Sequence, residues 1–310
     1  MKCVVTGGAG FIGRHVVQAL EAAQHEVVVV DLADGARRVD ICDSAALLEE
    51  FKRVGPEVVF HLAGVADARD ALNHPVKAVT INVGGTAGVL EAARQTGVKR
   101  VILASTCWVA NAMGNGLLDE QALFLPEGGG HVYTTTKIAS ELLAHDFHKL
   151  YGLPFTILRY GIPYGPGMWS GLVLKNFLDR AAAKQPLVIF GDGSASRRFV
   201  HVEDLARAHV LALQDVATNQ IYNLEGMRFV TVRELAELVA KLLGGVEIQY
   251  KAEPTRVGEF QYFRKLISGN KAYIDLGWAP QVDLEDGVRR TIDWYRREVV
   301  GKAPAATKAL

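Results

Sequence analysis

A glycine-rich segment close to the N-terminus limits the possible folds of this chain more than any other feature of its sequence. The segment reads Thr6-Gly7-Gly8-Ala9-Gly10-Phe11-Ile12-Gly13; it directly follows a short β-branched run and opens an amphipathic stretch. Glycines at positions 7, 10 and 13 permit a tight turn, close approach of a pyrophosphate to the backbone, and close packing of a helix on a strand. Because the following helix would present N–H groups and the positive end of its dipole, the segment predicts a phosphate-binding strand–turn–helix unit.

Short apolar runs alternate with longer helical patterns through the first half of the chain. The runs are almost uninterrupted, as in strands covered on both faces; they are Val4-Val5, Val27–Val30, Val58–Phe60, Val101–Leu103 and Phe155–Leu158. The helical patterns between them are Gly13–Ala23, Ala45–Val54, Thr86–Thr96 and Thr135–Leu150. The alternation predicts βαβ units and an α/β fold with a Rossmann-type, doubly wound parallel sheet.

The regular alternation ends at Gly165-Pro166-Gly167. We therefore expect a dinucleotide-binding Rossmann domain at 1–165, a smaller, mainly substrate-binding lobe at 166–300, and a flexible tail at 301–310. Segments near 196–224 are expected to return to the first domain, because Phe199–Val202 and Ile221–Leu224 resemble further strands of the main sheet.

Composition excludes several classes of protein. Of the 310 residues, 34 are Lys or Arg and 34 are Asp or Glu, which argues against a nucleic-acid partner, since such proteins carry a basic excess. No window approaches the roughly 18 consecutive apolar residues of a membrane span, so no membrane partner is expected. Cys3, Cys42 and Cys107 are too few and too scattered for a disulfide framework or a zinc site. We expect a cytoplasmic protein without a bound metal.

Asp31 ends the second predicted strand, 24 residues after Gly7. A carboxylate at this position accepts hydrogen bonds from an adenosine ribose and repels a 2′-phosphate, so it favours NAD as the cofactor. The alternative is an ordinary N-cap aspartate. Arg37 and Arg38 lie just beyond and keep NADP open as a second possibility.

Tyr133 and Lys137 lie four residues apart at the start of a helical stretch, so both project from one face. An ammonium beside a phenol stabilises the phenolate, and we expect it to lower the tyrosine pKa from about 10. A phenolate there takes a proton from an alcohol while the alcohol carbon gives hydride to a nicotinamide. Thr106 ends the fourth predicted strand, where open α/β sheets bind ligands. A solvated surface pair is the alternative for Tyr133 and Lys137.

Taken together, these motifs resemble those of the extended short-chain dehydrogenase/reductase family, in particular its nucleotide-sugar epimerases and dehydratases. The resemblance covers nearly the whole chain, from the glycine-rich segment to Leu276-Gly277-Trp278 and Thr291-Ile292-Asp293-Trp294-Tyr295. Further landmarks are Asp40-Ile41, His61-Leu62-Ala63, Asn82, Tyr133 with Lys137, and Arg159-Tyr160 followed by Tyr164-Gly165-Pro166.

The resemblance implies a role for each matching position. NAD would be bound by Gly7, Gly10, Phe11, Ile12, Gly13, Asp31, Asp40, Ile41, Leu62, Ala63, Asn82, Tyr133, Lys137 and Tyr160. Tyr133, Lys137 and Thr106 would be catalytic, and Thr106 would also contact the sugar. Arg197 and Arg256 would bind the diphosphate of a nucleotide sugar, for which a planar guanidinium is suited. Ile189 and Phe190 would contact its base, although an apolar strand explains both residues equally well.

The residues after Thr106 favour one reaction within this family. Family 4,6-dehydratases carry Asp-Glu there, and the related decarboxylases usually keep the glutamate, whereas this chain has Cys107 and Trp108. Neither side chain supplies a carboxyl group, so the resemblance implies a 4-epimerase acting on a nucleotide-linked hexose or hexuronic acid, most simply a UDP-sugar. A nucleotide-sugar 4-ketoreductase, an atypical dehydratase, or a non-catalytic NAD(P)-sensing regulator are the alternatives.

Several positions differ from the family pattern near the expected sugar pocket. Ile162 replaces a common asparagine, Arg198 a common aspartate, and His131 follows three glycines in place of Ser-Pro. We expect His131 to be a loop residue, with an additional acid or base role as the alternative.

The family resemblance also implies a homodimer, in which helices near Thr86 and Thr135 pair into a four-helix bundle. Apolar stripes that include Val89, Leu90, Leu142 and Leu143 motivate this expectation, and burial within one chain is the alternative.

Overall fold

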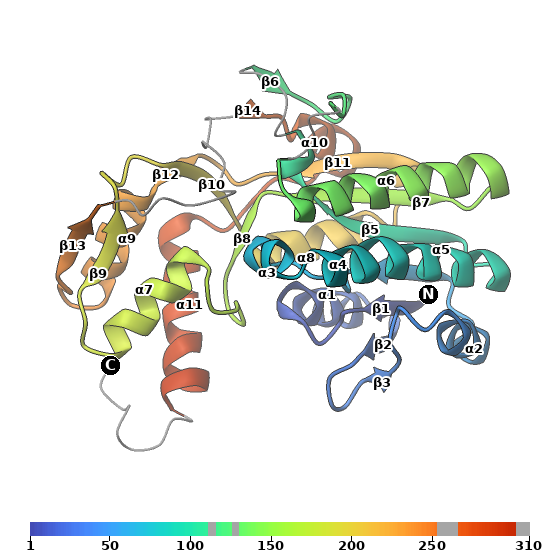
Figure 1. The fold of residues 1–310 in the computed structure, drawn as a ribbon, viewed down its shortest axis with the longest axis horizontal. Helices are drawn as coiled ribbons and strands as arrows, with labels where there is room; N and C mark the ends of the chain where they lie inside the picture. The colour runs from blue at the N-terminus through green and yellow to red at the C-terminus, as the bar shows by residue number, and fades with distance from the viewer. Residues whose placement is uncertain (111–115, 126–129, 253–265, 302–310) are drawn as a thin grey trace. The chain divides into compact units, whose positions relative to one another are not determined.

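The computed structural model describes residues 1–110, 116–125, 130–252 and 266–301. The chain forms two compact units (Figure 1). Unit 1 contains Met1–Gly161, Leu205–Leu224 and Lys265–Ala279, and unit 2 contains Ile162–Asp204, Glu225–Arg264 and Pro280–Leu310.

Unit 1 is built on a seven-stranded sheet in which every strand pair is parallel. Its order is β11-β7-β5-β4-β1-β2-β3, with bounds β1 (Lys2–Thr6), β2 (Glu26–Asp31), β3 (Arg37–Arg38), β4 (Val58–His61), β5 (Arg100–Thr106), β7 (Phe155–Tyr160) and β11 (Gln220–Leu224). The order reverses at β1, with β2 on one side and β4 on the other, as in a doubly wound sheet. The structure therefore confirms the predicted α/β fold with a doubly wound parallel sheet.

Helices cover both faces of this sheet, which explains why its strands are nearly continuous apolar runs. The helical segments of unit 1 are α1 (Phe11–Ala22), α2 (Ser44–Val54), α3 (Ala68–Asn73), α4 (Pro75–Val79), the π-helix η1 (Thr80–Gly84), α5 (Gly85–Thr96), η2 (Cys107–Ala110), α6 (Val132–Tyr151), η3 (Asp215–Ala217) and α10 (Asn270–Leu276), and α8 (Val202–Leu211) enters it. On one face, Val4 and Val59 pack with Phe51 of α2 and Leu90 of α5. Phe60 points to the opposite face, where its ring lies 6.0 Å from His209 of α8.

The two later segments that were expected in the main sheet only partly follow that expectation. β11 contains Ile221–Leu224 and joins the seven-stranded sheet beside β7, as expected. β10 (Ser196–His201), which contains most of Phe199–Val202, does not return to that sheet. It pairs in parallel with β8 (Ile162–Tyr164) and antiparallel with β12 (Phe229–Thr231), so its hydrogen-bonding edges are already used in a separate three-stranded sheet.

The described part of unit 2 combines that small sheet with a second strand pair and four helical segments. The pair consists of β9 (Leu187–Phe190) and β13 (Ile248–Lys251). The helical segments are α7 (Val173–Ala182), α9 (Val232–Leu242), α11 (Leu284–Trp294) and the π-helix η4 (Tyr295–Val300). A short pair, β6 (Leu117–Leu118) with β14 (Leu266–Ile267), belongs to unit 1.

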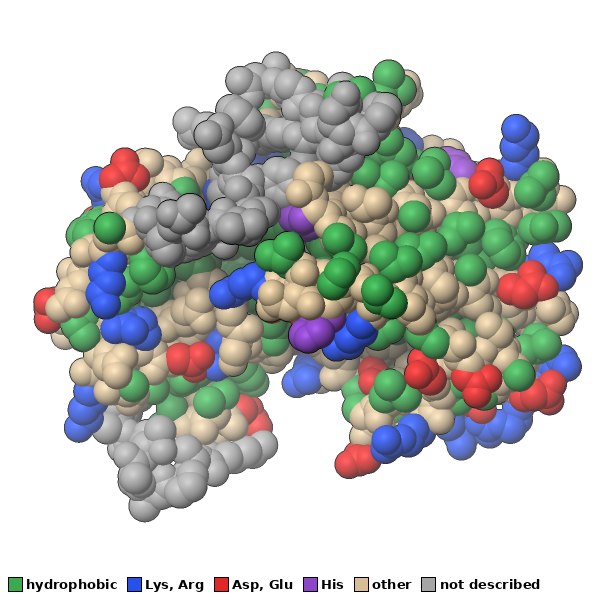
Figure 2. Space-filling view, in the orientation of Figure 1, with side chains coloured by type: hydrophobic (Ala, Val, Ile, Leu, Met, Phe, Trp, Pro, Cys, Tyr) green, Lys and Arg blue, Asp and Glu red, His purple; other side chains and the backbone are tan. Residues whose placement is uncertain are grey.

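An exposed apolar surface lies over α3, α4 and α6, helices that contact one another. It consists of Leu72, Val76, Val79 and Leu142, which are between 45% and 78% exposed, and we call it the α4–α6 patch. Figure 2 shows hydrophobic side chains gathered over this face. Of the apolar residues expected in a dimer bundle, Val89 and Leu90 are instead buried in the core, and Leu143 packs against it.

No helix in the described ranges is both long and apolar enough to cross a membrane.

His209 occupies a buried position between two hydrogen-bond partners. Its Nδ1 lies 2.8 Å from the Leu205 carbonyl oxygen and must donate to it, so Nε2 accepts from the Tyr160 hydroxyl at 2.7 Å. Burial lowers the pKa of His209 to about 4 from its usual value of 6.5. The folded chain therefore resists protonation of a group that the unfolded chain protonates readily.

We predict that the free energy of unfolding falls as the pH drops from about 6.5 to about 4, because only the unfolded state takes up the His209 proton. This one group contributes roughly 3 kcal/mol across that range. His209→Gln should flatten the pH dependence in urea unfolding, whereas His74→Gln, at an exposed histidine, should change it far less. An equal slope in His209→Gln and the parent chain would contradict this assignment.

Candidate functional site

The glycines of the first turn serve two different needs. Gly7 has φ +73°, and a Cβ there would lie 2.5 Å from the Ala63 backbone nitrogen. A Cβ on Gly13 would lie 2.0 Å from the Gly7 carbonyl oxygen. Both positions therefore need glycine for packing within the protein. Gly10 is exposed, and its nearest neighbour would be the Gly7 oxygen at 3.1 Å, so little in the protein itself excludes a side chain there.

The turn leads into the N-terminus of α1, which is suited to an anion. Gly10 is the N-cap, and no side chain caps the helix. The uncapped first turn offers backbone N–H groups together with the positive end of the helix dipole. Arg14 folds back over the turn, where Nε donates to the Gly10 carbonyl (3.2 Å) and a terminal nitrogen donates to that of Ala9 (3.1 Å). Arg14 was not predicted as a site residue, because its only signal in the sequence is its place directly after the last glycine.

Asp31 lies beside this turn at the end of β2. One carboxylate oxygen accepts from the Ala9 N–H (3.0 Å) and the other from the Ala33 N–H (3.1 Å). It does not cap a helix, so the N-cap alternative is wrong. Arg37 and Arg38 are exposed on β3, where Arg38 pairs in register with Asp31 and lies 3.7 Å from Asp34.

Four further predicted cofactor residues surround the same end of the sheet. Asp40 accepts from the Cys42 N–H (2.9 Å), and Ile41 is buried against Gly85, where a Cβ would lie 2.5 Å from the Ile41 side chain. Leu62 donates its N–H to the Thr6 carbonyl (3.0 Å), and Ala63 makes the close contact with Gly7. These contacts fix the chain after β4 next to the glycine turn.

Asn82 lies in the π-helix η1 and is 2% exposed. Its amide oxygen accepts from the Val65 N–H (2.7 Å), while its nitrogen donates to the Val65 carbonyl (3.0 Å) and to the Thr136 hydroxyl (2.9 Å). Thr136 in turn donates to the Tyr133 carbonyl (2.7 Å). Both amide hydrogens are thus taken by protein acceptors, and Asn82 joins the loop after β4 to the first turn of α6.

Thr106, Tyr133 and Lys137 come together in unit 1. Tyr133 shares a side-chain hydrogen bond with Thr106, whose hydroxyl also accepts from the Trp108 N–H (3.2 Å). Lys137 donates to the Ala104 carbonyl (3.0 Å). The residues that the sequence singled out for proton transfer are therefore adjacent, as the helix–strand packing of α6 on β5 requires.

The predicted lowering of the tyrosine pKa does not appear in the structure. Burial raises the pKa of Tyr133 to about 12, against a smaller opposing effect of the Thr106 hydrogen bond. Burial also lowers the pKa of Lys137 to about 8, against the opposing charge of Glu141. Desolvation therefore disfavours the charged forms of Tyr133 and Lys137 by more than their proximity was expected to favour them.

Three aromatic rings lie against one another at the start of α6. Trp108 is edge-on to His131, with ring centroids 5.3 Å apart, and to Tyr133, at 6.2 Å; His131 and Tyr133 are 5.8 Å apart. His131 is the N-cap of α6, because its Nδ1 accepts from the Thr134 N–H (3.3 Å). The expected loop residue is thus a helix cap whose ring packs beside the phenol.

The other predicted residues have varied surroundings. The Tyr160 hydroxyl is buried on His209. Ile189 is fully buried, so its side chain has no surface to offer a base, whereas the neighbouring Phe190 is 44% exposed. Arg197 is partly buried on β10 and donates to the Ser196 carbonyl (2.7 Å). Arg256 lies outside the described residues.

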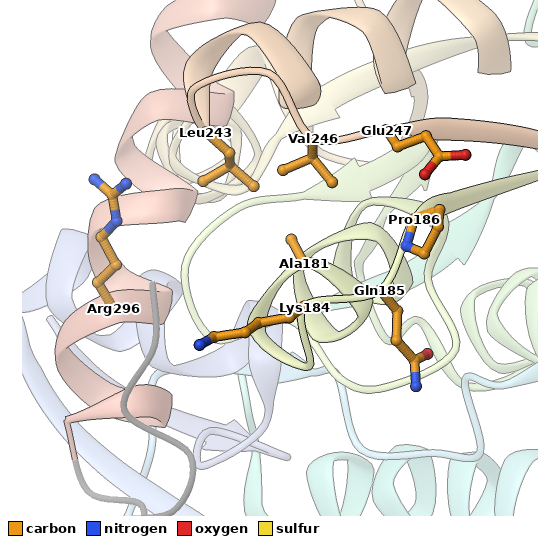
Figure 3. Close-up of a pocket in the computed structure, with 8 residues that line it drawn as sticks. All are labelled: Ala181, Lys184, Gln185, Pro186, Leu243, Val246, Glu247 and Arg296. Carbon is orange, nitrogen blue, oxygen red and sulfur yellow. The ribbon is translucent and has the colours of Figure 1, made fainter.

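Unit 2 contains a cavity of about 440 Å³ between the end of α7 and the α9–β13 connection (Figure 3). Its lining combines apolar side chains with the charged groups of Lys184, Glu247 and Arg296. None of the predicted site residues that the structure describes lines it.

The residues of unit 1 fit NAD. The exposed Gly10 and the uncapped N-terminus of α1 suit a pyrophosphate, and the Asp31 carboxylate suits a ribose diol and disfavours a 2′-phosphate. Tyr133 and Lys137 belong to the same unit, at the end of β5, where a nicotinamide can be held near them.

We predict opposite outcomes for two substitutions in the turn. Gly13→Ala should lower Tm by several degrees, because its methyl group would meet backbone that has to move. Gly10→Ala should keep Tm close to that of the parent chain and weaken NAD binding about tenfold or more, equivalent to about 1.4 kcal/mol. Thermal unfolding and NAD titration of both variants check this; unchanged NAD affinity in Gly10→Ala would contradict it.

Comparisons with known proteins agree with this geometry. The model of the NAD dependent epimerase/dehydratase family matches residues 3–224. A putative UDP-glucose 4-epimerase of Methanocaldococcus jannaschii is 30% identical over 94% of this chain and 98% of its own. The structure of Thermus thermophilus UDP-glucose 4-epimerase in complex with NAD has a TM-score of 0.85 and 32% identity, covering 96% of this chain and 100% of that one.

A dehydratase relative is similar to about the same degree. The dTDP-glucose 4,6-dehydratase of Streptomyces venezuelae, solved with NAD bound, has a TM-score of 0.83 and 30% identity over 96% of this chain and 98% of its own. On the family match, the full-length relatives and the Rossmann-type sheet with its glycine turn, the chain belongs to the NAD-dependent epimerase/dehydratase family.

Proposed function

We propose that this chain is an NAD-dependent UDP-sugar 4-epimerase, acting on a UDP-hexose or a UDP-hexuronic acid. Relatives named as epimerases and as dehydratases are both similar to it, so membership of the family leaves the reaction open. The observation that carries the choice is the pair of residues after Thr106. Cys107 is buried, with its thiol directed to the Arg159 carbonyl (3.3 Å), and Trp108 packs on Tyr133 and His131. Neither group supplies the carboxylic acid or base that water elimination uses.

Three side chains carry the proton transfer in this proposal. The Tyr133 phenolate takes the proton of the sugar C4 hydroxyl and later returns it, and the Thr106 hydroxyl shares that proton through its hydrogen bond to Tyr133. Lys137 supplies a positive charge one helical turn away, which favours the phenolate. Bound NAD would supply a reversible hydride acceptor for C4, so that hydride can leave one face of the sugar and return to the other. Because the pKa of Tyr133 is high, its phenolate needs the positive charge of Lys137 in order to form near neutral pH.

The remaining predicted residues hold the two ligands. We assign the backbone of Gly7–Gly13 to the pyrophosphate of NAD and Asp31 to its ribose, with Asp40, Ile41, Leu62, Ala63 and Tyr160 around the dinucleotide. Asn82 acts as a positioning residue, because its amide hydrogens are taken by Val65 and Thr136. Arg197 and Arg256 would bind the UDP diphosphate, and Phe190 is the better candidate of its pair for the base, since Ile189 is buried.

We predict that the purified enzyme interconverts a UDP-sugar with its C4 epimer without net formation of NADH. Tyr133→Phe should lower kcat about 10²- to 10⁴-fold, because it removes the general acid–base group. Tyr151→Phe, at an exposed tyrosine at the end of the same helix, is the matched control and should keep full activity. Product analysis by NMR and absorbance at the NADH wavelength check this.

Two outcomes of that experiment would contradict the proposal. Stoichiometric consumption of NADH would indicate a 4-ketoreductase, and loss of water from the sugar would indicate a dehydratase. Full turnover by Tyr133→Phe would remove the mechanism.

We also propose a cytoplasmic homodimer in carbohydrate metabolism. Cys3, Cys42 and Cys107 form no disulfide within the described residues, in keeping with a reducing compartment. The α4–α6 patch supports self-association, because exposed apolar side chains on adjacent helices suit the isologous contact of a two-fold dimer. α6 also carries Tyr133 and Lys137, so a helix bundle across the patch would hold the catalytic helix in place.

We predict that Leu142→Asp converts this dimer to monomer, because it places a charge within the apolar α4–α6 patch. The matched control is Ile274→Asp on α10, which adds a charge at an equally apolar, 76% exposed position outside the patch. Light scattering of the three proteins measures the mass. A parent chain that is monomeric at micromolar concentration would contradict the proposed dimer.

A further inference from the structure

A buried ion pair lies next to the proposed catalytic residues and has no part in the mechanism above. Glu141 is fully buried and Arg159 is 2% exposed. Two guanidinium nitrogens of Arg159 contact the carboxylate: Nε lies 3.0 and 3.2 Å from its two oxygens, and a terminal nitrogen lies 2.7 Å from one. The Ser105 hydroxyl donates to the same carboxylate at 2.5 Å. A charge is costly to bury, and pairing of this quality is what makes it tolerable.

The pair joins α6 and β5, which carry the proposed catalytic residues, to the neighbouring strand β7. Ser105 immediately precedes Thr106 at the end of β5, and Arg159 lies opposite Ser105 in the register of β5 and β7. Glu141 reaches both from α6. The Cys107 thiol, which also contacts the Arg159 carbonyl, extends the connection beyond Thr106 (3.3 Å). One carboxylate therefore fixes how α6 sits on the two strand ends.

Glu141 also occupies a defined place on α6 relative to Lys137. Tyr133, Lys137 and Glu141 are spaced by four residues each, so they follow one another along one face of the helix. The charge of Glu141 raises the pKa of Lys137, against the effect of burial. His61 of β4 faces Lys137 from the sheet, and burial lowers the pKa of that imidazole to about 3, which keeps it neutral. Among these neighbours, Glu141 provides the negative charge.

We propose that Glu141 and Arg159 form a positioning pair that holds the ends of β5 and β7 against α6 and keeps Lys137 cationic beside Tyr133. The proposal deepens the proposed function, because it rests on Lys137 assisting Tyr133. Neither Glu141 nor Arg159 touches substrate. The Arg159 cation offsets the cost of burying the Glu141 carboxylate. The Glu141 carboxylate in turn stabilises the protonated form of Lys137.

The test is a titration of the Lys137 side chain itself. In the full-length protein labelled with 13C- and 15N-lysine, the Lys137 signal is assigned by its absence in Lys137→Met and followed by NMR against pH. The parent chain should titrate with a midpoint of about 8. Glu141→Gln removes the negative charge and leaves the Arg159 cation unpaired, so the midpoint should fall by about one unit or more, a tenfold loss of proton affinity.

Two further variants separate this role from a purely structural one. The double variant Glu141→Gln/Arg159→Met removes both charges, so its Lys137 midpoint should lie between those of the parent and of Glu141→Gln. If Glu141→Gln alone does not fold, the double variant is used for the test. Glu50→Gln breaks another ion pair of unit 1, with Arg53 on α2, and should leave the Lys137 midpoint unchanged. All proteins are compared at the same content of bound NAD.

An unchanged Lys137 midpoint in folded Glu141→Gln or in the double variant would overturn the proposal. In turnover at pH 7, Glu141→Gln should lower kcat about twofold, because a midpoint that falls from about 8 to about 7 reduces the cationic fraction of Lys137 from roughly nine-tenths to one half, with KM little affected. The NMR titration needs no substrate. A parent chain that epimerises no UDP-sugar but shows the expected shifts would therefore remove the proposed function and leave the positioning pair in place.

Discussion

Contact between backbones at the first turn is the constraint on which unit 1 depends. Gly7 and Gly13 leave no room for side chains, because Ala63 and the carbonyl of Gly7 itself occupy that space. This contact joins β1, α1 and the segment after β4 at the point where the strand order reverses. Gly10 has no comparable packing neighbour, and the helix behind it is uncapped. Gly7 and Gly13 thus fix the turn by close packing, whereas Gly10 remains accessible to a ligand.

The electrostatics around α6 follow from burial. Tyr133 and Lys137 are both shifted away from their charged forms, and the compensating contacts come from Thr106 and Glu141. Polar side chains on the same side of the helix, among them Ser140 and Thr136, join it to Asn82 through hydrogen bonds. A helix held by so many buried polar contacts has few alternative placements, because each lost partner would leave a desolvated group.

Local sequence patterns predicted the sheet well, since apolar runs covered by helices have a strong signature. The glycine turn, Asp31 and the Tyr133–Lys137 spacing also identified residues that the structure brings to one end of that sheet. The pairing of β10 was mispredicted, because an apolar run does not encode which edge it joins. The tyrosine pKa was mispredicted for a related reason: spacing on a helix gives adjacency, whereas burial depends on the whole fold. Glu141 and Arg159 carried no signal as a pair, because they lie 18 residues apart on different elements.

The π-helix between α4 and α5 decides which apolar residues face the core. The helix runs without interruption from Pro75 to Thr96, through Gly84 and Gly85. In a regular helix Val79 and Leu90, eleven residues apart, would share one side, since eleven residues make about three turns. The wider turn shifts the helical phase by about one residue, and Val79 is 48% exposed whereas Leu90 is 1% exposed. Val79, before the π-helix, therefore faces outward, and Leu90, after it, faces the core. Asn82 lies within the π-helix that separates them.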